Sequence, residues 1–197
     1  FFNDTATTEI YTLSLTTLFR SRSIYTESKR LGEAILNKEL GDRATFFRIC
    51  LAYSPNFLIG DKRVMYELIV KGLTNDSIKL IDEGSSQRQY LYIDDAIYMM
   101  RNIASNLDNK KYNIDGAWNI CNNSKISILE LAKLIGDLLD KPVITGPKDI
   151  NPLHALSNIE IIPRRYQETF GKYKYTALND GIKKVIKSAE KQLNIYK

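Results

Sequence analysis

Apolar residues follow two alternating patterns along the chain, and these patterns predict an alternation of helices and strands. Between residues 26 and 40 they recur at helical spacing, with Lys and Glu between them. This spacing predicts an amphipathic helix whose apolar face carries Leu31, Ile35, Leu36 and Leu40. Residues 44–52 instead form a nearly continuous apolar run, which is typical of a strand buried on both faces of a parallel sheet.

The same two patterns continue to the C-terminus. They predict helices over 64–73, from Asp94 or Asp95 to about 104, 127–138, 163–170 and 178–193, and strands over 77–81, 89–93, 118–121 and 143–144. Asp94 or Asp95 is expected to cap the second of these helices. Ser127 and Glu130 have the spacing of a capping box.

Strands that alternate with helices predict an α/β fold with a parallel sheet. Parallel sheets of this kind bind ligands beyond the carboxyl ends of their strands. The segments after Tyr53, Ile81 and Cys121 are therefore the expected ligand-binding positions.

The amino-acid sequence of residues 3–21 differs in character from that of the rest of the chain. They resemble the translation of a DNA sequencing-adapter oligonucleotide, so we expect residues 1–22 to be a non-native leader and 23–197 to be the natural fragment. The alternative is a genuine Thr-rich β-strand, because the segment holds many β-branched residues.

The composition limits the classes of protein to which the chain can belong. A chain of 197 residues with 44% apolar content suits one globular domain. No apolar run approaches the roughly 18 residues of a membrane span, and no secretory signal is recognisable, so a cytoplasmic location without membrane contact is expected.

Cys50 and Cys121 stand in apolar surroundings, and His154 is the only histidine. These residues predict neither a metal site nor a Ser-His-Asp triad.

The net charge of +5 raises the question of an anionic partner. Lysines are spread along the chain and gather mainly near its C-terminus, and the aromatic residues form no stripe with them. We therefore expect small anionic substrates such as nucleotides, and no nucleic acid.

Tyr25 and Lys29 are the strongest candidates for chemistry. On a helix they stand one turn apart on the same face. A free phenol is a poor base at neutral pH, but a nearby ammonium favours the phenolate. The pair is also consistent with two ordinary exposed side chains, because Tyr and Lys are both frequent in this chain.

Five segments, taken in order, resemble the extended short-chain dehydrogenase/reductase family of NAD-dependent nucleotide-sugar epimerases, dehydratases and decarboxylases. They are the Tyr-x-x-x-Lys segment from Tyr25 to Lys29, the strand end from Arg48 to Pro55, the run from Gln87 to Asp95, Trp118 to Ile120 with the following helix, and the closing segment from Phe170 to Ile182.

This resemblance implies an incomplete Rossmann-like sheet with a small α/β substrate-binding part. It implies that Tyr25 removes the proton of the sugar 4-hydroxyl and that Lys29 holds the ribose of NAD, so that both residues contact the cofactor. Arg88, and less strongly Arg63, are the residues expected to bind the diphosphate of a nucleotide sugar. The helix with Tyr25 and Lys29 is expected to form a homodimer interface.

The chain also departs from the family pattern. Leu51 stands where the family usually has an Asn that contacts substrate, and Ser54 stands where it usually has Gly. No glycine-rich turn for the NAD pyrophosphate is present, so the cofactor-binding half is expected to be missing and the fragment to be inactive alone. Two alternatives stay open: a UDP-glucuronate decarboxylase-like enzyme, and a non-catalytic sugar-nucleotide-binding or dimerisation relative.

Overall fold

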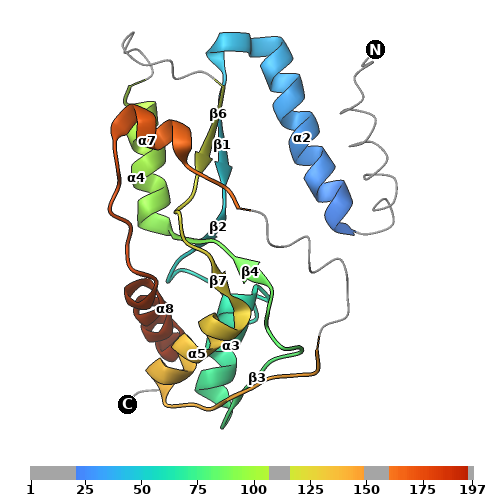
Figure 1. Ribbon diagram of the computed structural model, residues 1–197, viewed down its shortest axis with the longest axis vertical. Helices are drawn as coiled ribbons and strands as arrows, with labels where there is room; N and C mark the ends of the chain where they lie inside the picture. Colours follow the sequence, from blue (N-terminus) through green and yellow to red (C-terminus); the bar gives the residue numbers. More distant parts are fainter. Residues whose placement is uncertain (1–20, 107–115, 149–159, 195–197) are drawn as a thin grey trace. The chain divides into compact units, whose positions relative to one another are not determined.

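The computed structural model describes residues 21–106, 116–148 and 160–194, and residues 1–20 of the predicted leader and His154 lie outside them. In order, its elements are α2 (Ser21–Leu40), η1 (Gly41–Arg43), β1 (Thr45–Ile49), β2 (Leu51–Tyr53), α3 (Val64–Thr74), β3 (Ile78–Lys79), β4 (Gln87–Arg88), β5 (Tyr90–Tyr92), α4 (Ile93–Ala104), β6 (Gly116–Ile120), β7 (Ile126–Ser127), α5 (Ile128–Leu139), β8 (Val143–Ile144), α7 (Arg164–Phe170) and α8 (Leu178–Gln192). Figure 1 shows these elements along the chain. The alternation of strands and helices confirms the predicted α/β class.

The described residues divide into two compact units. One holds residues 21–46 and 116–117, and the other holds 47–106, 118–148 and 160–194. We call them the α2 unit and the main unit, and each is described by itself.

Strand pairing in the main unit includes the predicted parallel arrangement. β2 pairs with β5 in parallel, with Leu51 opposite Tyr90 and Tyr53 opposite Tyr92. β3 and β8 form a second parallel pair, whereas β4 and β7 are antiparallel. β1 pairs with β6. Because side chains alternate across a strand, the β2–β5 register places Tyr53, Tyr90 and Tyr92 in one aromatic group.

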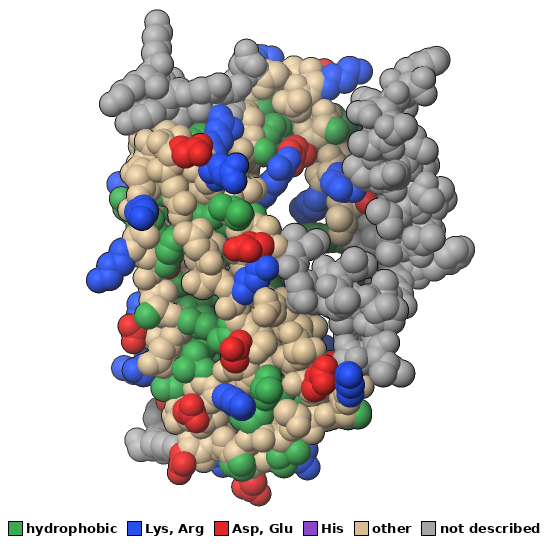
Figure 2. Space-filling view, in the orientation of Figure 1, with side chains coloured by type: hydrophobic (Ala, Val, Ile, Leu, Met, Phe, Trp, Pro, Cys, Tyr) green, Lys and Arg blue, Asp and Glu red, His purple; other side chains and the backbone are tan. Residues whose placement is uncertain are grey.

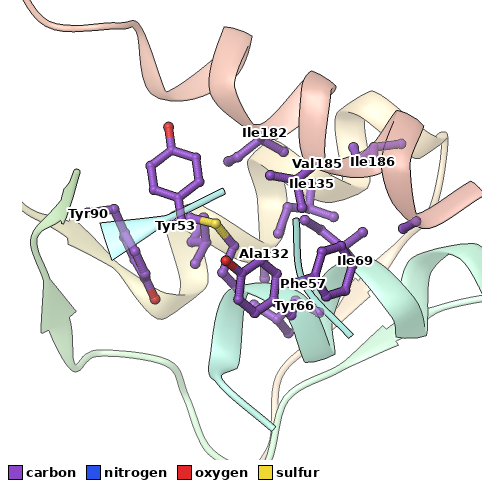
Figure 3. Close-up of a cluster of buried hydrophobic side chains, with 14 of the residues drawn as sticks. Tyr53, Phe57, Tyr66, Ile69, Tyr90, Ala132, Ile135, Ile182, Val185 and Ile186 are labelled. Carbon is purple, nitrogen blue, oxygen red and sulfur yellow. The ribbon is translucent and has the colours of Figure 1, made fainter. Parts of the chain in front are cut away.

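The core of the main unit forms where α3, α5 and α8 pack together (Figure 3). Ile69, Ile135 and Ile182 are fully buried, one from each helix. α3 approaches α5 closely at Gly72, where an added Cβ would lie 2.6 Å from Leu139 Cδ1 and would require that side chain to shift. Burial of this apolar surface stabilises the unit, by roughly 25 cal/mol per Å² removed from water.

The prediction that residues 44–52 are buried on both faces is wrong. The segment splits into β1 and β2, and β1 is partly exposed along its whole length. Phe47, Ile49 and Leu51 remain 36%, 44% and 46% exposed. Burial on both faces requires a covering layer on each face of a sheet, and among the described residues β1 belongs to a sheet of two strands, paired with β6.

The prediction that Asp94 or Asp95 caps α4 is also wrong. Tyr92 occupies the N-cap position and no side chain caps this helix. Asp95 is 3% exposed and instead accepts hydrogen bonds from the Tyr173 hydroxyl, the Thr176 backbone N–H and the Thr176 hydroxyl, at 2.9–3.0 Å. Asp95 thus ties α4 to the segment that leads into α8.

The capping box at the start of α5 is confirmed. The Ser127 hydroxyl accepts from the Glu130 N–H at 3.1 Å, and Glu130 Oε2 accepts from the Ser127 N–H at 2.8 Å. These hydrogen bonds from Ser127 hold the pKa of Glu130 below its ordinary value.

Replacing Ser127 by Ala should lower the free energy of unfolding by about 1 kcal/mol, because a first-turn N–H of α5 loses its side-chain acceptor. Urea denaturation followed by circular dichroism measures the change. Ser124→Ala, three residues earlier on an exposed loop, is the matched control and should change stability by less than about 0.5 kcal/mol. Equal losses in the two variants would contradict the role of the capping box.

Candidate functional site

Tyr25 and Lys29 lie side by side on α2, as their spacing predicts. The Lys29 ammonium is 5.5 Å from the centroid of the Tyr25 ring. Tyr25 is 66% exposed, so its hydroxyl is open to an incoming molecule. The backbone under the pair is a regular helix, reinforced by a hydrogen bond of 2.8 Å from the Ser28 hydroxyl to the Tyr25 carbonyl. The catalytic role of the pair stays a prediction.

The apolar residues of α2 are exposed as well. Ile24, Leu31 and Ile35 are 68%, 60% and 51% exposed. At about 100° per residue these three project from one face, whereas Tyr25 and Lys29 project from a neighbouring face roughly 100–140° further round. The helix therefore presents an apolar face and, separately, the face that carries the Tyr25–Lys29 pair.

Arg88 belongs to the main unit, on β4. Its Nη1 donates to the Gln87 carbonyl at 2.7 Å, and its neighbour Ile126 lies opposite on β7. The charge of Arg88 reaches Tyr90: burial raises the pKa of Tyr90 to about 12, and the guanidinium works against this rise.

Arg63 precedes α3, and its guanidinium forms an ion pair within the protein. Its Nη2 and Nε donate to the Asp61 carboxylate, with the shortest distance at 2.7 Å, and its guanidinium lies 4.7 Å from the centre of the Tyr66 ring. This pairing holds the pKa of Asp61 below its ordinary value. Because the Arg63 side chain is 59% exposed, solvent weakens this ion pair.

Leu51 and Ser54 mark the altered strand end. Leu51 lies opposite Tyr90 and is 46% exposed, so an apolar side chain stands where a polar contact is usual in the family it resembles. Ser54 closes the turn after β2: its hydroxyl donates to the Asn56 carbonyl and accepts from the Asn56 N–H, at 3.1 and 3.0 Å. Its φ is not positive, so this turn does not require glycine.

Arg63, Arg88 and Leu51 belong to the main unit, and Tyr25 and Lys29 belong to the α2 unit. Within the main unit, Leu51 pairs with Tyr90, which is two residues from Arg88. Arg63 reaches the same strand end through Tyr66, whose hydroxyl accepts the Ser54 N–H at 3.0 Å.

Sequence reasoning missed the role of Gln89. It is 6% exposed, and its amide donates to the carbonyls of Asn122 and Ile161 while its oxygen accepts the Ile161 N–H at 2.7 Å. One side chain therefore holds two distant segments beside Arg88. Its only sequence signal was a polar residue in an otherwise apolar strand.

A cavity of about 530 Å³ opens in the main unit. The segment after Cys121 borders it, which is one of the three positions predicted to bind ligands, and Tyr53 at the carboxyl end of β2 borders it as well. Its lining consists of Tyr53, Tyr90, Asn122, Ser124, Lys125, Ile126, Glu130, Leu134, Tyr175, Thr176, Ala177 and Leu178. None of the five site residues predicted from the sequence lines it.

Neither cysteine has the properties of a nucleophile. Burial raises the pKa of Cys50 to about 11 and that of Cys121 to about 12, so both stay protonated at neutral pH.

The described residues contain no cluster of three or more potential metal ligands. None of the described helices is long and apolar enough to cross a membrane. Acidic and basic side chains are interspersed over the described surface that Figure 2 shows.

Comparisons with solved structures show a common fold. An epimerase from Methanothermobacter thermautotrophicus has a TM-score of 0.68 and 13% identity, over 85% of this chain and 50% of its own. UDP-glucuronic acid 4-epimerase from Bacillus cereus, in complex with UDP-glucuronic acid and NAD, has a TM-score of 0.63 and 16% identity, over 86% of this chain and 52% of its own. This chain thus spans about half of each.

Sequence comparison finds relatives in Arabidopsis thaliana. UDP-glucuronic acid decarboxylase 1 is 23% identical over 122 residues, which are 60% of this chain and 27% of that protein. The chain therefore spans about a quarter of this relative. The model of the "NAD dependent epimerase/dehydratase family" matches residues 4–121, which is more than half of the chain. The chain belongs to the NAD-dependent epimerase/dehydratase family.

Proposed function

We propose that this chain carries the proton-transfer helix and part of the substrate site of an NAD-dependent nucleotide-sugar epimerase or dehydratase. The observation that supports this most directly is the Tyr25–Lys29 pair, with 5.5 Å between ammonium and ring centroid, inside the segment that matches the family. Solved neighbours hold NAD with UDP-glucuronic acid, or NAD alone in the dTDP-glucose 4,6-dehydratase of Bacillus anthracis.

In this proposal Tyr25 accepts the proton of the sugar 4-hydroxyl while that carbon is oxidised to a ketone. Lys29, one turn away, stabilises the phenolate by its charge and hydrogen-bonds the ribose of the cofactor. Bound NAD supplies the hydride acceptor for this oxidation. The exposed Tyr25 and Lys29 fit the ribose end of NAD, whereas the chain has no G-x-G-x-x-G turn for its pyrophosphate. We therefore propose that the fragment does not turn over without a dinucleotide-binding half.

Arg88 and Arg63 are proposed to bind the nucleotide diphosphate. Planar guanidinium groups suit two-pronged binding of phosphate oxygens. Arg88 is the stronger candidate, because Gln89 fixes the backbone beside it, whereas Arg63 must first release Asp61.

Observations also support the two alternative functions. A decarboxylase acting on UDP-glucuronate passes through the same oxidation at C4, and the Arabidopsis relatives are named UDP-glucuronic acid decarboxylases. A non-catalytic relative is favoured by Leu51, an exposed apolar side chain at a position where the family usually has an Asn that contacts substrate.

Replacing Tyr25 by Phe should reduce turnover roughly 100- to 10,000-fold, because the phenyl ring cannot accept the proton. The measurement uses the chain joined to a complete NAD-binding half, with formation of the 4-keto sugar from UDP- or dTDP-sugars as readout. Tyr98→Phe, at a tyrosine 51% exposed on α4, is the matched control and should retain activity. Turnover that survives Tyr25→Phe would remove Tyr25 from the mechanism.

Replacing Leu51 by Asn should strengthen substrate binding roughly 2- to 10-fold if a polar contact is missing at this position, since one net hydrogen bond contributes about 0.5–1.5 kcal/mol. The same joined protein and KM for the nucleotide sugar measure the effect. Leu58→Asn, at a leucine 81% exposed, is the control. An unchanged or higher KM would show that the pocket is built around Leu51.

We also propose that the apolar face of α2 forms a homodimer. Leu31→Glu should shift the protein to monomer in sedimentation velocity, because a charge would be buried at the interface. Asn37→Glu adds the same charge on another face of α2 and should leave the dimer intact. A monomeric wild-type chain, or a dimer unaffected by Leu31→Glu, would contradict this interface.

A further inference from the structure

The two cysteines of the chain lie on neighbouring strands of the main unit. Cys50 stands between β1 and β2, and Cys121 directly follows β6, the strand that pairs with β1. At one end of this pair the Gly116 N–H donates to the Ala44 carbonyl at 2.9 Å. At the other end the Cys50 N–H donates to the Ile120 carbonyl at 3.1 Å. Residue numbers therefore rise in the same direction along both strands, and the pair is parallel.

The parallel register sets the two cysteines opposite each other. Because the Cys50 N–H bonds the Ile120 carbonyl, Ile49 lies opposite Ile120. The next facing position holds Cys50 and Cys121, and the Asn122 N–H, one residue further, forms a hydrogen bond with the Cys50 sulfur. Facing side chains lie on the same side of a sheet, and neighbouring strands are about 4.8 Å apart. This spacing falls within the roughly 4.4–6.8 Å between Cα atoms that a disulfide spans.

The two sulfur atoms differ in their access to solvent. Cys121 is fully buried, and its Sγ donates to the Ile161 carbonyl at 3.3 Å. Cys50 is partly exposed, so a small molecule from solvent reaches its sulfur first. The Ile161 carbonyl also accepts a hydrogen bond from the Gln89 amide at 2.9 Å. Loss of the Cys121 S–H would therefore leave this carbonyl with a partner.

Burial favours a disulfide at this position over a pair of thiolates. It is the main cause of the raised pKa values of Cys50 and Cys121, about 11 and about 12, and the neighbouring Cys50 adds to the rise at Cys121. A disulfide is strongly oxidising when its reduced form is stabilised. Here the charged thiolates are destabilised, whereas the uncharged disulfide carries no such penalty. Because little thiolate is present at neutral pH, oxidation is slow and its product resists reduction.

We propose that Cys50 and Cys121 are a redox modification site, which a peroxide converts into a disulfide between β6 and the start of β2. The Cys50 thiolate attacks a peroxide oxygen: an S–O bond forms, the O–O bond breaks, and the leaving hydroxide takes up the Cys50 proton to give water. The Cys121 sulfur then attacks the Cys50 sulfenic acid: an S–S bond forms, the S–O bond breaks, and the leaving hydroxide takes up the Cys121 proton. Two electrons pass from the two thiols to the peroxide, which leaves as two molecules of water.

The disulfide fixes the strand end that carries Leu51. It joins Cys50, the residue before Leu51, to the end of β6, and it closes the long stretch of chain between the two cysteines. Closure of a long loop restricts the unfolded state and so stabilises the folded one. The oxidised chain should therefore melt about 5–15 °C higher than the reduced chain. This site does not depend on the function proposed above, because it uses neither the Tyr25–Lys29 pair nor the two arginines.

The test treats the folded full chain with excess hydrogen peroxide, unfolds it in guanidinium chloride and alkylates the free thiols. Mass spectrometry should show no alkylation, and peptide mapping without reductant should join the peptides of Cys50 and Cys121. An intramolecular disulfide can only be this one, because the chain has no other cysteine. Its rate of formation should rise about tenfold per pH unit between pH 7 and 9, because Cys50 reacts as the thiolate. Dithiothreitol should lower the melting temperature of the treated chain by about 5–15 °C.

Cys50→Ser is the matched control, since it removes the partly exposed sulfur and keeps every methionine. After the same peroxide treatment its melting temperature should not respond to dithiothreitol, which does not reverse methionine oxidation. The peptide map of the unaltered chain keeps the test decisive if this variant perturbs the fold. Three results would overturn the proposal: both thiols alkylated after treatment, oxidation of Cys50 to the sulfinic acid without a disulfide, or disulfides that join separate chains only.

Discussion

The parallel pairing of β2 with β5 is the constraint on which the main unit depends. Its register sets Leu51 opposite Tyr90 and Tyr53 opposite Tyr92, and it brings the altered strand end next to Arg88. The tyrosine rings that result fill the space below α8, where Gly181 must lack a side chain because a Cβ would collide with the Tyr53 hydroxyl. A shift of β2 by one residue against β5 would move Tyr53 to the other face, away from Tyr90 and Tyr92 and from its contact with α8.

Buried polar side chains hold the segments around this pair. Asp95 ties the start of α4 to the segment before α8, and Gln89 joins β5 to the residues around Ile161. Each makes three hydrogen bonds within the protein, so each satisfies the requirement that buried polar groups be paired. Apart from β1 and β6, the strands in this unit are only two or three residues long, and side-chain hydrogen bonds replace much of what a longer ladder would supply.

Local signals made most of the fold predictable from the sequence. The helix beginning at Ser127 was identified from a capping box that involves four consecutive residues, and the helix of Tyr25 from the period of its apolar residues. What failed depended on long-range contacts. Asp95 lies in the first turn of α4, where an acidic residue usually serves the helix, but its partners are about 80 residues away at Thr176. The apolar run around Phe47 predicted burial, but burial requires a covering layer, which no local pattern can report.

The candidate site was predictable to a similar extent. Spacing on a helix was enough to place Tyr25 beside Lys29, since both belong to one element. Spacing could not show that the Asp61 carboxylate pairs with the Arg63 guanidinium, or that Cys50 lies opposite Cys121. These properties arise from tertiary packing. The order of motifs identified the family, and the geometry of individual side chains needed the structure.

The uncovered strand β1 has a consequence for how copies of this chain behave together. Phe47 and Ile49 are exposed beside an edge that has no paired strand among the described residues. An open edge with apolar side chains can pair with the same edge of another molecule. Such pairing uses the same surface of both copies, so it closes into a dimer, as contact through one face of α2 also does. A substitution in α2 that leaves β1 unchanged therefore separates the two kinds of association.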